Sequence, residues 1–254
     1  MPPATRDGAA YRIAGRLARW RAAPALHPHG VLCSGTLDVP AHEGAGWGVR
    51  WLDRPGSYRA TVRWSRALGL PRRLPDALGL AVRVEDADGR GNALDLLFTS
   101  SGSGRLGRHL PLPRPAPLTG PYSTLLSYRT GERERVLAAF PAPGPSGPPE
   151  DGPLPALWQE LARRPVRFDL RAAAPGEPWR TFASLALEAA HGTPATHTVS
   201  YDPYAHTVPG LRPTGRLRRL RTAAYAGSRR GRTAGLAPEG GGGGAVPEAR
   251  PSRR

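Results

Sequence analysis

The sequence predicts an α+β protein built on a closed antiparallel β-barrel with peripheral α-helices. Strand-like runs follow one another at short spacing in the first half of the chain, and turn residues such as those at 86–89 separate them. No internal repeat is present, which argues against a solenoid or a propeller. The segments with helical character stand outside these runs. A sheet that closes on itself, with helices around it, therefore fits the order of the elements.

Six strands are expected. Four come before residue 100, at 30–37, 58–65, 78–84 and 93–99. The second has the clearest pattern, because every second residue from Tyr58 to Trp64 is apolar and these residues share one face of a strand. Two more strands are expected at 166–170 and 183–188, joined by a turn through Pro175-Gly176.

Helices are expected over residues 9–21, 122–139, 154–163 and 215–228. Three segments are expected to stay outside the core: a disordered N-terminus at 1–8, a Pro/Gly-rich loop at 141–153, and a Gly/Arg-rich tail at 234–254 that contains Gly240–Gly244. A chain of 254 residues is long enough for one substantial core. We therefore expect one folded domain over residues 9–233.

The charge of the chain is strongly positive, with a formal net charge of +16. Clustered cations bind phosphate backbones, so a basic phosphodiester-acting or nucleic-acid-binding protein is one alternative. However, all 36 basic residues are arginine, in a chain rich in Ala, Gly and Pro, and several lie in the tail. This distribution is typical of a GC-rich coding bias. We therefore do not expect a nucleic-acid partner.

The remaining composition bears on compartment. No run approaches the ~18 apolar residues of a membrane span, and the first residues lack the apolar stretch of a signal peptide, so we expect a cytoplasmic protein with no membrane partner. The single cysteine, Cys33, can form neither an internal disulfide nor a thiolate metal site. It is expected to be a small buried residue on a strand.

Two short motifs far apart in the chain carry the chemistry. The first is His27-Pro28-His29-Gly30, which places an imidazole ahead of a glycine-punctuated strand. The second is Arg221-Thr-Ala-Ala-Tyr225, which sets a guanidinium one helical turn before a phenol. A cation at that position lowers the pKa of the phenol and favours the phenolate, which binds iron. Together the motifs predict a haem site.

Five segments have a common family pattern in order and spacing. They are His27 with Gly30 and Gly35-Thr36-Leu37; Val62-Arg63-Trp64-Ser65; Pro75 to Arg83; Asp95-Leu96-Leu97; and Tyr201-Asp202-Pro203 with Val208-Pro209-Gly210, Arg221 and Tyr225. In this arrangement the chain resembles the haem catalases and their smaller catalase-like relatives, over scattered patches of residues 25–232. The long C-terminal extensions of full-length catalases have no counterpart.

The resemblance implies a haem b cofactor and its ligands. Tyr225 would be the iron ligand on the proximal side, with Arg221 keeping its phenol ionised. Arg63 and Arg232 fall where the family places arginines that bind the haem propionates. Pro24 stands where a further such arginine is expected.

On the distal side the resemblance implies that His27 moves a proton between peroxide oxygens and that Ser65 orients it. Thr99 stands where catalases carry an asparagine, so a hydroxyl replaces the amide that helps to polarise peroxide. We therefore predict a haem protein that acts on hydrogen peroxide or organic hydroperoxides with peroxidase-type chemistry. A non-catalytic haem-binding relative is the first alternative, and the sequence leaves open whether the chain forms a homo-oligomer.

Two further patterns do not indicate a binding site. Residues 102–107 match the G-x-G-x-x-G dinucleotide fingerprint, but a proline-rich segment follows where a helix would be needed, so we interpret them as a loop. Tyr201 and Tyr204 are also not expected to bind iron, since neither has an arginine four residues before it on a helix.

Overall fold

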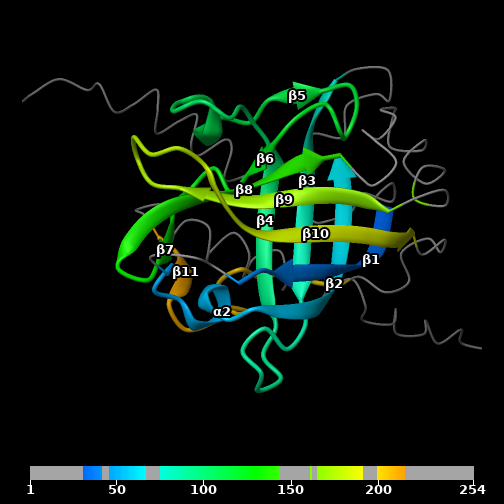
Figure 1. Cartoon of the computed structure of the whole chain (residues 1–254). Coiled ribbons are helices and arrows are strands. Elements are labelled where there is room, and N and C mark those ends of the chain that lie inside the picture. The colour runs from blue at the N-terminus through cyan, green and yellow to red at the C-terminus, as the bar shows by residue number, and fades with distance from the viewer. Residues whose placement is uncertain are drawn as a thin grey trace, which may run out of the picture.

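The computed structural model describes residues 31–41, 46–66, 75–143, 161, 165–190 and 199–214. Eight antiparallel strands form a closed barrel in the order β8-β6-β4-β3-β2-β1-β10-β9, and β9 pairs again with β8 (Figure 1). The barrel strands are β1 (Val31–Val39), β2 (Gly56–Arg66), β3 (Asp76–Val84), β4 (Leu94–Ser100), β6 (Tyr122–Ser123), β8 (Arg133–Ala142), β9 (Val166–Ala173) and β10 (Arg180–Ala190).

Short elements extend this barrel. β5 (Pro113–Arg114) pairs with β3, β7 (Tyr128–Thr130) pairs with β8, and β11 (Leu211–Pro213) pairs with β7. The helical residues described as complete elements are the single turn α2 (Arg50–Asp53) and the 3-10 turn η1 (Gly107–His109). Within the described part of the chain, no helix has the length and apolar composition needed to cross a membrane.

Closure of the barrel depends on one long-range pairing. Strands that follow one another along the chain are neighbours in the barrel, except that β1 pairs with β10, where Cys33 lies opposite Ala190. A bulge interrupts this seam between Ser34 and Gly35. Bulges increase the local bend and twist of a strand, which a small closed barrel requires.

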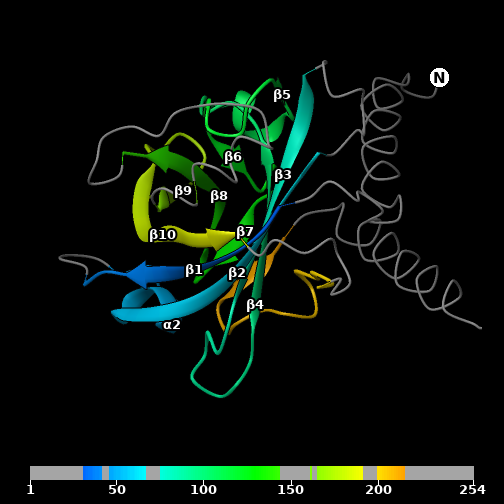
Figure 2. The same cartoon turned by 90° about the vertical axis from the view of Figure 1, so that its right-hand side faces the viewer.

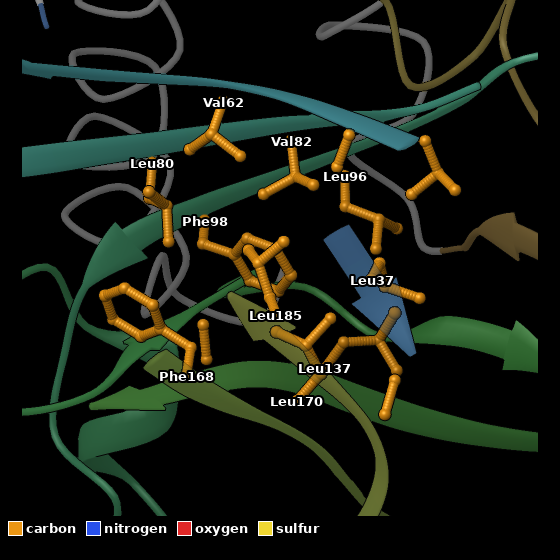
Figure 3. Close-up of a cluster of buried hydrophobic side chains, with 14 of the residues drawn as sticks. Leu37, Val62, Leu80, Val82, Leu96, Phe98, Leu137, Phe168, Leu170 and Leu185 are labelled. Carbon is orange, nitrogen blue, oxygen red and sulfur yellow. The ribbon is translucent and has the colours of Figure 1, made fainter. Parts of the chain in front are cut away.

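The barrel interior is the hydrophobic core. Strand alternation sends every second side chain of β1 to β4 inward, as in β2, where Ala60, Val62 and Trp64 are buried. Figure 3 shows Val62, Leu80 and Val82 on one wall of the barrel facing side chains from the opposite wall, Leu137, Phe168, Leu170 and Leu185. The interior is therefore filled by side chains.

An aromatic trio closes one end of this core. Trp64 and Phe168 have ring centroids 5.4 Å apart, and Tyr122 lies 6.1 Å from Trp64 and 6.3 Å from Phe168 in edge-on geometry. The Trp64 indole N–H donates to the Tyr122 hydroxyl at 3.1 Å, and that hydroxyl donates to the Pro117 carbonyl at 2.6 Å. Both polar atoms are thus satisfied inside the apolar interior.

The expectation of a closed antiparallel barrel is confirmed, and the six expected strands are present with ends that differ by up to three residues. The expected loop at 102–107 is also present; it contains only the turn that leads into η1.

The helix expected at 122–139 is wrong. These residues form β6, β7 and most of β8 instead, so the described part of the chain is mostly β and only partly fits an α+β class. Gly131, with φ of +61°, makes the turn between β7 and β8. A Cβ there would lie 2.8 Å from the carbonyl oxygen of Trp47, so a left-handed conformation and close packing both require glycine at this point.

The other expected helices, at 9–21, 154–163 and 215–228, lie outside the described residues apart from Leu161, which is helical and buried. The same holds for the N-terminal segment 1–8 and the tail 234–254. Of the expected loop at 141–153, Pro141 and Ala142 belong to β8. Residues 144–153 lie outside the described residues.

Candidate functional site

The outer face of β2, β3 and β4 brings two predicted site residues into one row. Ser65 on β2 lies opposite Gly79 on β3, and Gly79 lies opposite Thr99 on β4. Residues directly opposite in a sheet share a face. Because the neighbours Trp64 and Phe98 point into the core, Ser65 and Thr99 point outward.

Gly79 keeps the row compact. A Cβ at this position would lie 3.1 Å from the Ser65 hydroxyl oxygen, closer than side chains normally pack. With glycine, the floor between Ser65 and Thr99 is backbone alone. Thr99 is almost fully buried, with 6% of its surface exposed.

Arg63 belongs to the next row of the same face. It lies between Leu32 on β1 and Ala81 on β3, and Ala81 lies opposite Leu97 on β4. Burial lowers the pKa of the Arg63 guanidinium, while the nearby Tyr201 acts in the opposite direction. A guanidinium remains charged despite such a shift, and a desolvated one interacts strongly with an anion. The row is therefore a small apolar floor with one partly buried cation.

A third row, on the same face, anchors the segment 199–206. Arg83 donates from Nε and Nη2 to the two carboxylate oxygens of Asp95, at 2.8 and 2.7 Å. Asp95 is fully buried, and its Oδ2 also accepts from the backbone N–H of Asp202 at 2.7 Å. The Arg83 Nη2 further donates to the Ser200 carbonyl at 2.8 Å. A bidentate pair thus holds a distant part of the chain against β3 and β4.

His206 completes this cluster. Its Nδ1 lies 2.8 Å from Asp95 Oδ2 and 2.9 Å from Arg83 Nη2, and its carbonyl accepts from the Asp95 N–H at 3.1 Å. The side chain is 39% exposed. His206 is thus a loop residue whose imidazole is held by two partners.

Tyr201 lies over the outer face beside these rows. Its hydroxyl donates to the Thr61 carbonyl at 3.4 Å, and the Arg83 guanidinium lies 5.4 Å from the ring centroid. Burial is the main influence on this phenol and raises its pKa. The phenol is thus held neutral, the opposite of what a phenolate bound to iron requires.

The backbone of this chain superposes on those of several solved structures. A fungal catalase superposes with a TM-score of 0.60 at 13% identity, over 93% of this chain and 64% of that one. The fold is catalase-like. Catalase A from Saccharomyces cerevisiae gives a TM-score of 0.58 at 10% identity, over 93% of this chain and 66% of that one. A bacterial catalase gives 0.58 at 12%, over 94% and 62%.

The chain thus spans less than two thirds of the length of each of these catalases. No family model matches the sequence. No curated protein matches it either. At these identities the likeness establishes the fold alone.

On this catalase-like barrel, three of the predicted site residues are described. Arg63, Ser65 and Thr99 lie on one outer face, in adjacent rows. The other four, His27, Arg221, Tyr225 and Arg232, lie outside the described residues. Among the described residues, no group of three or more His, Cys, Asp or Glu side chains is placed to hold a metal ion.

The Arg83–Asp95–His206 cluster was missed by sequence reasoning. A signal was present, since Arg83 and Asp95 each interrupt an apolar strand on its outward side. Only the register of β3 against β4 shows that they are directly opposite. For His206, more than 100 residues along the chain, nothing in the sequence indicated this contact.

Proposed function

We propose that the outer face of β1 to β4 is one wall of a haem site, in a protein that acts on hydrogen peroxide or organic hydroperoxides by peroxidase-type chemistry. The observation that carries this proposal is the placement of Arg63, Ser65 and Thr99 in adjacent rows of one face. The catalase-like fold supports it. The haem domain of this proposal extends over residues 9–233.

The chemistry of the face suits haem b. Leu32, Ala81 and Leu97 provide small apolar contacts, which a planar macrocycle needs on its face. Arg63 stands among them as a partly buried cation, and a guanidinium fork matches a propionate carboxylate. When bound, haem supplies a redox-active iron to which peroxide binds.

The chain positions further residues around this wall. His27 is four residues before Val31, and four residues span at most ~14 Å, so its imidazole can reach the outer face beside Trp64 and Ser65. We assign it the proton transfer between peroxide oxygens, with the Ser65 hydroxyl as its orienting partner. Tyr225, ionised by Arg221, is the proposed iron ligand, and Arg232 a second propionate partner.

Thr99 is the reason that we propose peroxidase-type chemistry and not fast dismutation of hydrogen peroxide. A threonine hydroxyl offers one donor on a short side chain, whereas an asparagine amide reaches further and offers two. Polarisation of peroxide is therefore weaker here than at an amide, and fast dismutation to oxygen is not expected.

The test is the absorption spectrum of the full-length protein titrated with haemin. The parent should bind one equivalent with a Soret band and the charge-transfer features of a phenolate ligand. Tyr225→Phe should lose the phenolate features and most of the affinity, while the control Tyr204→Phe keeps both. Equal spectra for parent and Tyr225→Phe would move the ligand elsewhere.

A second measurement separates the two haem hypotheses. His27→Ala should keep the spectrum and lose about 10²–10⁴-fold of the rate with hydrogen peroxide, the usual contribution of a general acid/base. A parent that binds haemin and reacts no faster than this variant is a non-catalytic haem carrier. If the parent binds no haemin, the proposal is contradicted. The alternative of a basic phosphodiester-acting or nucleic-acid-binding protein is then favoured.

A further inference from the structure

The exposed large apolar side chains of the described residues all lie in one short segment. Leu106 is 80% exposed, Leu110 56% and Leu112 41%, all within seven residues of the connection between β4 and β5. We call residues 101–114 the leucine loop. Figures 1 and 2 place β5, in which the loop ends, at one end of the barrel, and the turn between β3 and β4 at the opposite end. Grouped exposed leucines mark an interaction site more often than scattered ones do.

The loop presents these leucines from a hydrogen-bonded frame. Gly102 and Leu110 both donate their backbone N–H groups to the Gly107 carbonyl, at 3.0 and 3.1 Å. The Ser123 hydroxyl donates to the Arg108 carbonyl at 2.5 Å, and the Trp179 indole N–H donates to the Ser103 carbonyl at 2.9 Å. The leucines therefore remain exposed although the backbone around them is held on several sides.

Arg108 adds a further brace. It is 6% exposed, and its guanidinium lies 4.6 Å from the ring centroid of Trp179 on the β9–β10 connection. His109 Nδ1 lies 2.9 Å from the Leu125 carbonyl. These contacts hold the backbone at 108–109 against the barrel, while Leu106 and Leu110 on either side of it face solvent.

The leucine loop itself carries charge of one sign. Residues 101–114 contain no Asp or Glu, and of their three arginines Arg105 is exposed next to Leu106. Arg108 is buried, and Arg114, which lies opposite Asp76 on β3, donates from Nη2 to the Ser101 carbonyl at 2.5 Å. A partner for this loop must therefore be apolar where the leucines enter and negatively charged around them.

A second copy of the chain does not meet this requirement. Two identical loops in a symmetric contact would bring the exposed Arg105 of each copy close to that of the other. A groove on a folded partner would have to match three separately protruding leucines. A lipid bilayer needs no such shape match, because its headgroup region yields to protruding side chains and its anionic lipids supply the negative charge.

We propose that the leucine loop is a peripheral membrane-binding site that inserts Leu106, Leu110 and Leu112 at the surface of an anionic lipid bilayer, with Arg105 at the headgroups. This inference is independent of the haem proposal, because vesicle binding is measured on the protein with or without haemin.

The test is co-sedimentation of the full-length protein with vesicles. The parent should pellet with phosphatidylglycerol–phosphatidylcholine vesicles and stay in solution with phosphatidylcholine alone. The double variant Leu106→Ser/Leu110→Ser should lower the partition coefficient by about tenfold or more, since two leucines no longer leave water. Arg105→Ser should lower it by about fivefold.

Arg90→Ser is the matched control. Arg90 is an exposed arginine in the turn between β3 and β4, at the opposite end of the barrel, and its loss should leave partition nearly unchanged. All substituted residues are exposed, so circular dichroism and the melting temperature should match the parent.

Three outcomes would overturn the proposal. The parent could fail to pellet with anionic vesicles. The double leucine variant could bind as well as the parent, which would assign binding to other arginines, those of the C-terminal tail included. Finally, the double variant could change the sedimentation coefficient of the protein without changing vesicle binding, which would make the loop a contact between copies of the chain.

Discussion

At the scale of single residues, Asp95 holds the segment 199–206 to the barrel. Its carboxylate accepts both donors of the Arg83 fork, the backbone N–H of Asp202, and a contact from His206. It is fully buried, whereas Arg83 keeps 21% of its side chain exposed. Loss of one member of such a group leaves the rest desolvated and unpaired.

Asp95→Asn should therefore lower the free energy of unfolding by about 2–4 kcal/mol, because an amide cannot accept two charged donors at once. Urea unfolding followed by circular dichroism measures this. Asp169→Asn is the matched control, since Asp169 and Arg171 form a pair whose side chains are each about one third exposed, and such pairs contribute ~0–1 kcal/mol. Similar losses in the two variants would contradict the anchoring role.

Cys33 gives a pH-dependent prediction. Burial on β1 raises the pKa of its thiol to about 12, so at pH 9 the native thiol should be alkylated roughly a thousandfold more slowly than the unfolded one. Because the folded pKa lies above the unfolded value, the contribution to stability is complete below the unfolded pKa, about 8.5, and is lost as the pH rises toward 12. Iodoacetamide labelling with and without urea measures the rates. Fast labelling of the native protein would show that β1 is open at the seam.

Thr99→Asn tests the distal wall. The asparagine amide should raise oxygen evolution from hydrogen peroxide by about tenfold or more in haem-loaded protein, because it adds a donor where charge develops. An oxygen electrode measures this. Thr181→Asn, at an exposed position of β10 outside the proposed wall, is the control and should have no effect. A parent already as fast as the variant would show that the amide is irrelevant here.

At the scale of elements, a strand can be predicted from its sequence pattern when only one of its two faces is buried. β2 was predictable because one face is buried and the other is not, which gives period-2 alternation. In β8, Val136 to Ala139 are all buried, so no alternation exists, and the arginines and glutamates before them favour a helix. Tertiary contacts made that segment a strand. The one local signal against a helix was Gly131, in the turn between β7 and β8.

The candidate site was predictable to the same extent. Ser65 and Thr99 each stand on a predicted strand, so their outward direction follows from the alternation. Their common row does not, because it depends on the register of both with Gly79. The Arg83–Asp95 pair could not be predicted for the same reason, because it depends on the register of β3 against β4.

Gly35 lies where β1 packs most closely against β10, so its substitution tests how tightly the barrel is closed. A Cβ at this position would overlap the carbonyl oxygen of Ala186 on β10, and backbone cannot move aside as a side chain can. Gly35→Ala should therefore lower the free energy of unfolding by about 3 kcal/mol or leave the protein unable to fold. Gly104→Ala is the control, since nothing lies within 4 Å of its added Cβ. A Gly35→Ala protein with the melting temperature of the parent would show that the strands separate easily.

At the scale of the whole molecule, the barrel connects the two ends of the described chain. β1 begins at Val31 beside the end of β10, and the segment 199–214 returns across β4 to pair with β7. The proposed haem site would draw on residues from both ends, so haem binding should stabilise the barrel as well as the segments that hold it.

The seam between β1 and β10 also sets an order of events during protein synthesis. β1 leaves the ribosome before its partner on β10, which follows about 150 residues later and so after roughly 8–30 s at ordinary elongation rates. Throughout that interval the edge of β1 offers unpaired backbone groups to any strand nearby. A β10 strand from a neighbouring nascent chain satisfies the same hydrogen bonds as the chain's own. Closely spaced ribosomes on one messenger therefore favour barrels closed by an exchanged strand, and a chaperone that covers β1 until translation ends favours the monomer.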